Sequence, residues 1–570
     1  MPYKTWVRLP LLAILCAGVA LGGCQSQTTV SATGNTPAQY THVFLTVNQV
    51  WFNTSATATP TDTSWTKFAL STPVTVDLVT LNNGTLSQIA SSLKLSSGTY
   101  GQVMLILADS TDTLTTSAST AGAATNDEVD YIDAADVSHT VPLAILNAAE
   151  GIGIVTSLTV AASSSSGLGG LGDSSAATSS TSTATSSSTS LSAVVASTSV
   201  IVNFDATRDL VPISLSGQPA FALNPHPTTY NVSSSGTIQG AVSLTNVTTL
   251  TNADWPDVQV AAEGLSSDGT RHVVAATTRV GTDGTFILYP LSTASGAAST
   301  YDIVIHGPEI QTVIIKAVPV TNAAPGSAAA LLGTVTLTAA TPYLVNLSAA
   351  ASPTSSSVGF YQTLPLSGEV PYLIEQRALD PTSGEFASAQ ELSNGPLQYG
   401  SYATSGGTVT LTAANPTQGG ATYSIGAVNP AYGEATLSTT VAAPASSAAT
   451  ALFTMSAPPA PSGATADAIT GTITVSGTAY DNAELFLTYN GALVAAAPLT
   501  TYLGSGSSNL SLSAVAPGGS AAATYAAGVY YGEIWAWNSS NPTGTLTRIP
   551  SATPINMSAG NATGVTLSIN

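Results

Sequence analysis

The sequence contains few charged residues, and the shortage is greatest for positive charge. Only 7% of its 570 residues are charged, and 10 Lys and Arg stand against 30 Asp and Glu. No basic cluster offsets this imbalance anywhere along the chain. Contacts with the phosphates of nucleic acids or with anionic headgroups are therefore disfavoured. The sequence does not predict a nucleic-acid-binding protein.

Cysteine is almost absent as well. The two cysteines, Cys16 and Cys24, both lie near the start, and Cys16 falls inside an apolar run. Without an internal disulfide, a secreted chain of this length must be stabilised by burial of apolar side chains. One remaining cysteine cannot build a cysteine-based metal site, and we expect neither a metal nor a cofactor.

Long apolar runs are missing after the first 24 residues. In that opening stretch, Lys4 and Arg8 precede an apolar run of fifteen residues, 9–23, which is shorter than the roughly 20 residues of a membrane-spanning helix. A basic start, a short apolar run and small residues before a cleavage point are typical of a secretory signal. Its loss would leave a net charge of 8 − 30 = −22.

The end of this run, Leu21-Gly-Gly-Cys24, resembles the lipobox of bacterial lipoproteins. The resemblance implies that residues 1–23 are a signal peptide, and that Cys24 is lipidated and anchors the mature protein in the cell envelope. Several acyl chains anchor a protein stably where one binds only marginally. Gln25, rather than an aspartate, follows the cysteine, which by the same resemblance implies the outer membrane. Residues 24–38 are polar and small, and they predict a flexible tether.

From Tyr40 onward, short segments alternate apolar and polar residues with the period of two that predicts strands. Four segments in residues 39–232 carry a resemblance: Tyr40–Val50, Pro73–Leu78, Gly98–Leu105 and Phe204–Val211. They resemble a β-sandwich domain of unknown function found near the N-terminus of bacterial lipoproteins, which implies a fold and a location but no reaction. A Ser/Thr/Gly-rich insertion at 163–192 is too polar to pack, and it predicts a disordered loop.

The rest of the chain predicts further sandwiches. Residues 235–350 contain Gly236–Gly240, Thr282–Phe286 and Tyr301–Ile305, and they resemble the carboxypeptidase-regulatory-like, prealbumin-type domain. We predict a third β-sandwich over 358–455 and a C-terminal one over 465–570, where Asn490-Gly491 between alternating runs is a strong hairpin signal. The predicted class is thus all-β, with tandem Ig-like or prealbumin-like sandwiches after a lipoprotein signal peptide.

Several motifs have a simple structural interpretation. The acidic stretch 126–136 could offer oxygen ligands to calcium, but its spacing favours a solvated hairpin. The run 167–172 matches a dinucleotide fingerprint without the strand and helix that this motif requires. Ser64–Lys67 and Ser91–Lys94 have a serine–lysine spacing that is expected by chance in a serine-rich chain.

The sequence gives no local signature of catalysis. Its histidines are scattered over separate segments, so a Ser-His-Asp triad could arise only by folding; they are His42, His139, His226, His272 and His306. We therefore predict that the protein is not an enzyme. A secreted hydrolase whose triad is invisible in the sequence stays open as an alternative, and it requires a Ser or Asp within reach of one histidine.

Aromatic residues gather near the C-terminus. Tyr531, Glu533, Trp535 and Trp537 share one face of a strand, because they are spaced by two. Such a face either packs into a core or stacks on sugar rings. The favoured function is a membrane-anchored envelope protein for binding, adhesion or scaffolding; the alternative is a carbohydrate-binding surface protein with a ligand on Tyr531, Trp535 and Trp537.

Overall fold

The structure is a computed structural model of the chain. It describes residues 25–36, 39–133, 137–161, 197–215, 218–225, 227–245, 255–266, 268–293, 299–323, 325, 330–350, 357–378, 388–414, 421–429, 433–434, 439–442, 449–454, 468–476, 480–489, 492–504, 506–512, 529–538, 540, 547–551, 553–557 and 561–569. The predicted signal peptide, Cys24, the insertion 163–192 and the run 167–172 lie outside these residues. Strands dominate, and the all-β prediction is confirmed.

Unit 1 comprises residues 25–231 and packs two sheets around one core. The smaller sheet has the order β12-β9-β1-β4, and the larger one has the order β10-β11-β7-β6-β2-β5-β8 with β3 beside β2. The bounds are β1 (Gln25–Asn35), β2 (Tyr40–Asn53), β3 (Thr66–Asp77), η1 (Leu78–Thr80), β4 (Ser87–Ser96), β5 (Gly98–Leu107), α1 (Thr116–Ala121), β6 (Glu128–Ile132), β7 (Ser138–Ile145), β8 (Ile152–Val160), β9 (Ser197–Asp205), α2 (Ala206–Asp209), β10 (Leu210–Leu215), β11 (Gln218–Leu223) and β12 (Thr228–Asn231).

The predicted tether is wrong for most of its length. Residues 25–35 form β1, which pairs with β4 on one side and with β9 on the other. Val30 and Ala32 of this strand are buried in the core of unit 1. A strand whose apolar side chains are this small gives a weak sequence pattern, and it is held in place by partners far along the chain.

Unit 2 comprises residues 235–338 and is a single large sheet. Its central order is β15-β14-β17-β18-β13-β16, with β19 beside β13. The bounds are η2 (Val232–Ser234), β13 (Ser235–Thr245), η3 (Trp255–Asp257), β14 (Gln259–Leu265), β15 (His272–Arg279), β16 (Thr285–Ser292), β17 (Ser299–His306), β18 (Val313–Asn322) and β19 (Ala330–Thr338).

Unit 3 comprises residues 342–454, and it is interleaved with unit 2. Two of its strands, β24 and β25, extend the sheet of unit 2 because β24 pairs with β18. The other strands form the sheets β23-β20-β29 and β22-β21-β26-β27, with β28 beside β26. The bounds are β20 (Pro342–Ala350), β21 (Ser357–Gln362), β22 (Tyr372–Ala378), β23 (Ser388–Ser393), β24 (Gln398–Ser401), β25 (Thr412–Ala413), β26 (Thr422–Asn429), β27 (Gly433–Glu434), β28 (Thr439–Ala442) and β29 (Ala449–Thr454).

The predicted border at residue 350 is therefore misplaced. The last strand of the predicted domain 235–350 is β20, which pairs with β23 and β29 of unit 3. One core cluster also joins the two units, since Val304 and Ile314 of unit 2 pack with Phe360 and Tyr372 of unit 3. Alternation predicts a strand but not the sheet that it joins, so the sequence pattern could not reveal this exchange.

Unit 4 comprises residues 469–569 and has its own core between two sheets. The sheets have the orders β33-β30-β37 and β32-β31-β34-β35, with β36 beside β34. The bounds are β30 (Ile469–Val475), β31 (Asn482–Tyr489), β32 (Ala492–Pro498), η4 (Thr500–Tyr502), β33 (Gly506–Leu512), β34 (Val529–Trp537), β35 (Thr547–Pro550), β36 (Ile555–Asn556) and β37 (Ala562–Ile569).

All four units share one closing arrangement. The opening strand of each unit pairs in parallel with a strand from later in the same unit: β1 with β9, β13 with β19, β20 with β29, and β30 with β37. In units 2, 3 and 4 this partner is the last strand of the unit. Parallel neighbours require a long connection between them, so each pair joins residues that are far apart in the sequence.

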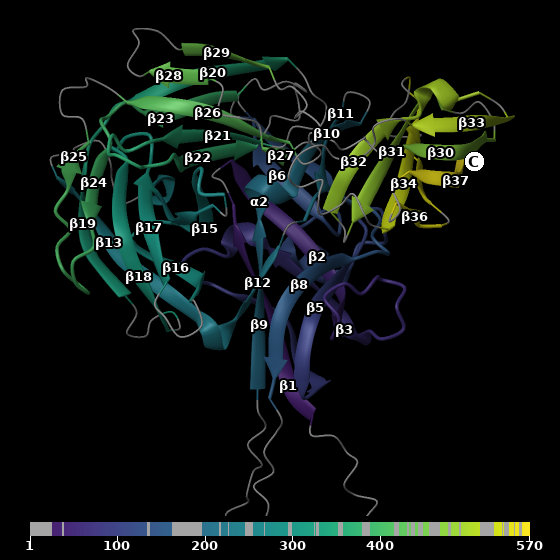
Figure 1. Cartoon of the computed structure of the whole chain (residues 1–570), viewed down its shortest axis with the longest axis horizontal. Helices are drawn as coiled ribbons and strands as arrows, with labels where there is room; N and C mark the ends of the chain where they lie inside the picture. Colours follow the sequence, from purple (N-terminus) through teal and green to yellow (C-terminus); the bar gives the residue numbers. More distant parts are fainter. Residues whose placement is uncertain are drawn as a thin grey trace, which may run out of the picture.

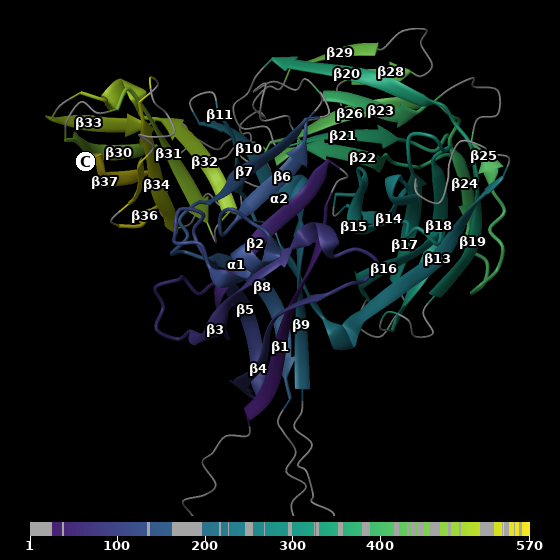
Figure 2. The same cartoon turned by 180° about the vertical axis from the view of Figure 1, so that it is seen from behind.

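Figure 1 shows how the units are arranged. Unit 1 is central and extends downward in this view, units 2 and 3 lie on one side of its upper part, and unit 4 lies on the other side. Figure 2, from behind, shows the same arrangement with the sides exchanged, and in both views the start of β1 lies at the lower end of unit 1. Among the described residues, no helix has the length and apolar character needed to cross a membrane.

Candidate functional site

The most developed polar site lies where unit 4 docks onto unit 1. Residues at alternate positions of β34 point to this junction, while Tyr530, Ile534 and Ala536 fill the core of unit 4. Trp535 is only 1% exposed, and it packs with Phe486 of unit 4 and with residues of unit 1, namely Ala144, Leu146 and Ala222. An apolar cluster therefore joins the two units.

This burial corrects the proposed glycan-binding strip. Tyr531, Trp535 and Trp537 share a face, as their spacing predicts, but Trp535 is covered by unit 1 and the other two are half-buried. Their face is neither an open platform for sugar rings nor part of the core of unit 4. It is a docking surface for another domain of the same chain, which a single strand pattern cannot distinguish from a core.

Glu533 and Arg548 form the charged centre of the junction. The Nε of Arg548 donates to Oε1 of Glu533 at 2.5 Å, and its Nη1 donates to both carboxylate oxygens of Asp109 of unit 1 at 2.7 Å. Its Nη2 donates to the carbonyl oxygen of Ile145 at 2.5 Å. The guanidinium also lies 5.3 Å from the ring of Trp535. One side chain thus spans both units with the fork geometry that suits carboxylates.

A tight turn of unit 1 completes the network. Asn147 has a φ of 49° and donates its backbone N–H to Oε2 of Glu533 at 2.6 Å. Its side-chain amide donates to Oγ1 of Thr488 at 2.8 Å, and that hydroxyl donates to Glu150 at 2.5 Å. Asn is one of the few residues that adopt a left-handed conformation readily. This conformation lets both amide groups of Asn147 reach unit 4.

The electrostatics of the junction favour a charged pair. Burial lowers the pKa of Arg548, but the adjacent carboxylates of Glu533 and Asp109 outweigh this effect and raise it. Burial also raises the pKa of Tyr531, and the nearby Glu150 adds to the shift. The arginine therefore stays protonated at any physiological pH, and its contacts do not switch in that range.

A cleft of about 450 Å³ opens beside these groups. It is lined by residues of both units: Pro60, Thr61, Asp109, Thr111, Asn147, Ala148, Ala149, Glu150, Tyr531, Glu533, Arg548, Pro550 and Ser551. Its three carboxylates outnumber its single cation. Because each carboxylate accepts hydrogen bonds from within the protein, the arrangement suits domain docking better than acid–base chemistry, which needs a group poised to exchange a proton.

Two of the histidines lie next to a carboxylate, which is one of the contacts that a catalytic triad requires. His42 Nδ1 lies 2.7 Å from Asp77 Oδ2, and His139 Nε2 lies 2.7 Å from Asp133 Oδ2. Both rings stack on aromatic neighbours, and neither lines the cleft. Within the part of the chain that is described, no serine hydroxyl bonds to either of these two rings. His226 lies outside the described residues.

The serines and lysines of the two serine–lysine spacings are placed as follows in the fold. Ser64 accepts a hydrogen bond from Asn53, and Lys67 lies with its Nζ 3.6 Å from the centre of the Trp51 ring. Ser91 and Lys94 are exposed on β4. Cation–π attraction accounts for the position of Lys67 over the Trp51 ring.

The acidic stretch is not a solvated hairpin throughout, which corrects that prediction. Strands β6 and β7 do pair antiparallel, but Asn126, Asp127 and Glu128 are buried. Asp127 accepts a hydrogen bond from the backbone N–H of Thr46 at 2.8 Å, and burial raises its pKa well above 3.8. These side chains tie the loop after β5 to the sheet. Among the described residues, no group of three or more His, Cys, Asp or Glu is arranged to hold a metal ion; residues 134–136 are not described.

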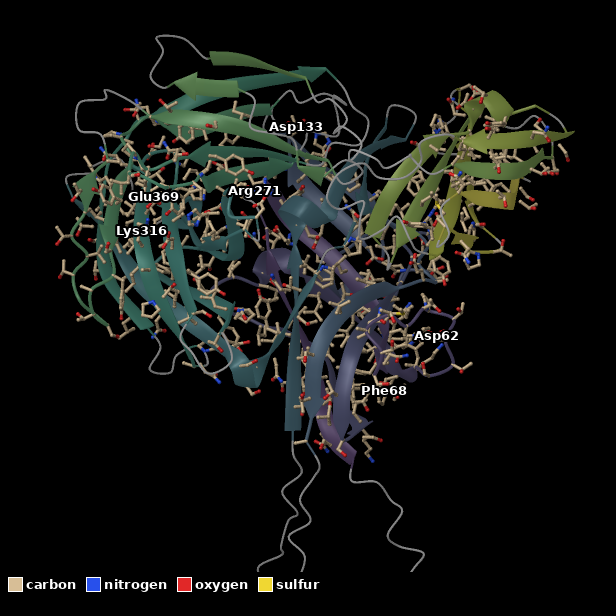
Figure 3. The ribbon with its side chains drawn as sticks, viewed as in Figure 1. Asp62, Phe68, Asp133, Arg271, Lys316 and Glu369 are labelled. Atoms are coloured by element: carbon tan, nitrogen blue, oxygen red, sulfur yellow. The ribbon has the colours of Figure 1, made fainter. Side chains whose placement is uncertain are left out.

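A second polar network links units 2 and 3. The hydroxyl of Tyr372 donates to Asp302 at 2.7 Å and to Glu369 at 3.1 Å, and Lys316 forms an ion pair with Glu369. Figure 3 shows Lys316 and Glu369 close together on this side of the molecule. The ring of His272 stacks on Tyr372 with 3.8 Å between centroids. This junction adds polar contacts to the shared apolar core.

Sequence reasoning missed Arg548, which bonds to Asp109 and Ile145 across the first junction. One signal was present: Arg548 is the only basic residue after Arg377. In a segment with several acidic residues and one cation, that cation is a good candidate for a structural pair. Asp109 and Asn147 gave no comparable signal, because their roles depend on the turn that positions them.

Fold and junctions together define an all-β multidomain protein with tightly docked units. Residues 26–225 match the model of a family described as Domain of unknown function (DUF4382), and unit 1 occupies these residues. The prediction of a domain of unknown function at this position is confirmed. No protein of curated function matches the sequence.

The solved structures that match this chain share little sequence with it. The Bacillus anthracis TIE protein is 8% identical over 98% of this chain and 77% of its own, with a TM-score of 0.14. Two B repeat units of the collagen binding protein of Staphylococcus aureus are 8% identical over 95% of this chain and 99% of their own, with a TM-score of 0.11. A DUF3823 family protein from Parabacteroides merdae is 10% identical over 55% and 96%, with a TM-score of 0.12. At such TM-scores these similarities support no argument about function.

Proposed function

We propose that the protein is a lipid-anchored protein of the bacterial cell envelope whose role is binding, adhesion or scaffolding rather than catalysis. The observation that carries the anchoring is the sequence before β1, where a basic start and a short apolar run end in Leu21-Gly-Gly-Cys24. Strand β1 begins at Gln25. Cleavage before Cys24 would therefore remove the signal and leave the fold intact.

The docking site supports a role without catalysis. The charged groups of the cleft are occupied by contacts between units 1 and 4, and they stabilise a fixed arrangement of domains. A protein that presents rigid surfaces to a partner gains affinity because little ordering has to occur on binding. We also propose that unit 2, residues 235–338, has the prealbumin-type fold that its motifs resemble and acts as a spacer between units.

Lipidation is tested by metabolic labelling with palmitate and by the mass of the mature N-terminus. We expect the wild-type chain to be labelled and to fractionate with membranes, and the Cys24→Ser variant to be unlabelled and still to begin at Met1. An unlabelled wild-type chain would contradict the proposal.

A change of Gln25, the residue after the cysteine, tests which membrane holds the protein. Gln25 favours the outer membrane by resemblance to lipoprotein sorting, so the Gln25→Asp variant should move to the inner membrane while keeping its lipid. Equal distribution of both variants would contradict the outer-membrane proposal. Pull-down and glycan-array binding with the mature chain, residues 25–570, would identify the partner class.

A further inference from the structure

We propose that the end of unit 1 at which β1 begins rests on the headgroup surface of the membrane, so that unit 1 holds unit 4 away from the lipid. This inference rests on the proposed lipidation of Cys24. It concerns an interaction surface whose partner is a phospholipid bilayer. We call this surface the tip and define it by the residues Gln25, Ser96, Ser97, Gly98, Ala161 and Ser197.

Strand register brings the tip residues together. Gln25 pairs with Ser96, Gln27 pairs with Ser197, and Gly98 pairs with Val160. The strand ends of both sheets of unit 1 therefore meet at one place. In Figure 1 and Figure 2 this end projects beyond the other units.

No residue lies between Cys24, the proposed lipid-attachment residue, and Gln25 of the tip. Gln25 follows Cys24 directly and is already paired in the sheet. Adjacent Cα atoms lie about 3.8 Å apart, so a lipid on Cys24 would be fixed within one residue of the folded domain. A flexible tether would let the domain tumble freely, whereas this connection restricts both its distance from the membrane and its orientation.

Charge at the tip differs from charge in the rest of the protein. Strands β1, β4, β5 and β8 contain no acidic residue, and the one acid in β9 is Asp205 at the far end. The exposed Lys94 lies near the tip, where it pairs with Gln27. In a mature chain of charge 8 − 30 = −22, strands without acidic residues repel anionic headgroups less than the acidic parts of the chain do.

The tip has no means of inserting into the hydrocarbon. None of the exposed large apolar side chains among the described residues belongs to it. The exposed tip residues Ser96, Ser97 and Ala161 are small, and the two serine hydroxyls can hydrogen-bond to headgroups and water. Contact at the surface, with the acyl chains of Cys24 alone entering the bilayer, is the arrangement that this composition supports.

The proposed orientation gives an approximate distance between the membrane surface and the junction of units 1 and 4. Strand β5 runs from Gly98 at the tip to Leu107, and Asp109, which binds Arg548, follows two residues later. Ten residues of strand span about 33 Å. Unit 4 would thus lie roughly 30 Å or more from the headgroups, with unit 1 as a rigid stalk.

The experiment uses the acylated full chain in vesicles of phosphatidylethanolamine with a smaller share of phosphatidylglycerol. Because the mature chain has no cysteine besides Cys24, a single introduced thiol can carry an environment-sensitive fluorophore. We place it at Ser97→Cys in the tip and, as the matched control, at Ser508→Cys on the exposed side of β33. Lipids with a quencher on the headgroup report proximity.

We expect the headgroup quencher to remove most of the fluorescence at position 97 and to leave position 508 unchanged. Ser96→Cys serves as a second tip variant if Ser97→Cys does not fold. Equal quenching at both positions in a protein that is acylated and membrane-bound would overturn the inference and leave the lipid anchor standing. A chain without a lipid that does not bind vesicles would refute both proposals.

Discussion

Removing the guanidinium of Arg548 should undock unit 4 from unit 1. The side chains of Arg548 and Glu533 are 14% and 4% exposed, so their pair is shielded from solvent. In Arg548→Met the methionine keeps most of the volume, but Glu533 stays buried without its cation. Breaking a buried pair on one side costs about 3–5 kcal/mol. Because Asp109 is 17% exposed and can regain water, we expect the lower end, about 3 kcal/mol.

The loss of docking energy can be measured through the fluorescence of the tryptophans at the junction. A loss of about 3 kcal/mol shifts the docking equilibrium about 100-fold toward the open form. Trp535 would then move from an apolar cluster to water, and its emission should shift to longer wavelength. Urea unfolding followed by this emission should show an early transition for unit 4. Far-ultraviolet circular dichroism should stay unchanged at zero urea, because each unit keeps its own core.

Two further variants make this prediction specific. Arg548→Met combined with Glu533→Gln should recover much of the lost stability, since no buried charge is left unpaired. Lys316→Met removes a cation from the other junction, and it should leave the emission of Trp535 unchanged. If Arg548→Met unfolds like the wild type, or if Glu533→Gln recovers nothing in its background, the assignment of this pair as the docking element is wrong.

Three other changes test separate parts of the structure. Trp535→Ala should weaken docking by about 3–5 kcal/mol, and a larger radius of gyration by X-ray scattering should accompany it; an unchanged radius would argue against a buried junction. Burial raises the pKa of Asp127 above 3.8, so the folded state keeps a proton that the unfolded state releases above about pH 4, and stability falls as the pH rises from there. Asp127→Asn should therefore raise the melting temperature at pH 7 and have no effect near pH 4, while a gain that is equal at both pH values would refute this cause. An added Cβ at Gly471 would lie 1.8 Å from the carbonyl oxygen of Val565, so Gly471→Ala should destabilise unit 4 by about 3 kcal/mol in calorimetry, whereas the exposed Thr472→Ala should have little effect.

The class of fold was predictable because alternation depends on neighbours in the sequence. Strand β8, for example, buries Leu158 and Val160 and exposes Ser157 and Thr159, and that pattern survives in any β-sandwich. Strand β1 has only Val30 and Ala32 to bury, so the same rule fails there. The sequence pattern predicts which face of a strand is buried, but it does not predict which sheet or domain covers that face.

The candidate site was not predictable, because its contacts join distant segments. Arg548 and Asp109 are separated by 439 positions, and no local pattern records such a pairing. The spacing of the acidic stretch predicts a solvated hairpin, but Asp127 and Glu128 are buried. Their burial depends on backbone donors such as the Thr46 N–H, which only the folded chain supplies.

The parallel pairing of the first and last strands in units 2, 3 and 4 has a mechanical consequence. In unit 4, the first residue of β30 and the last residue of β37 lie at opposite ends of one parallel pair. A pull on the two termini of the unit would slide these strands along each other, so that all the hydrogen bonds between them bear the load together instead of opening one after another. With the same arrangement in β13 with β19 and in β20 with β29, units 2, 3 and 4 are all built to resist tension along the chain.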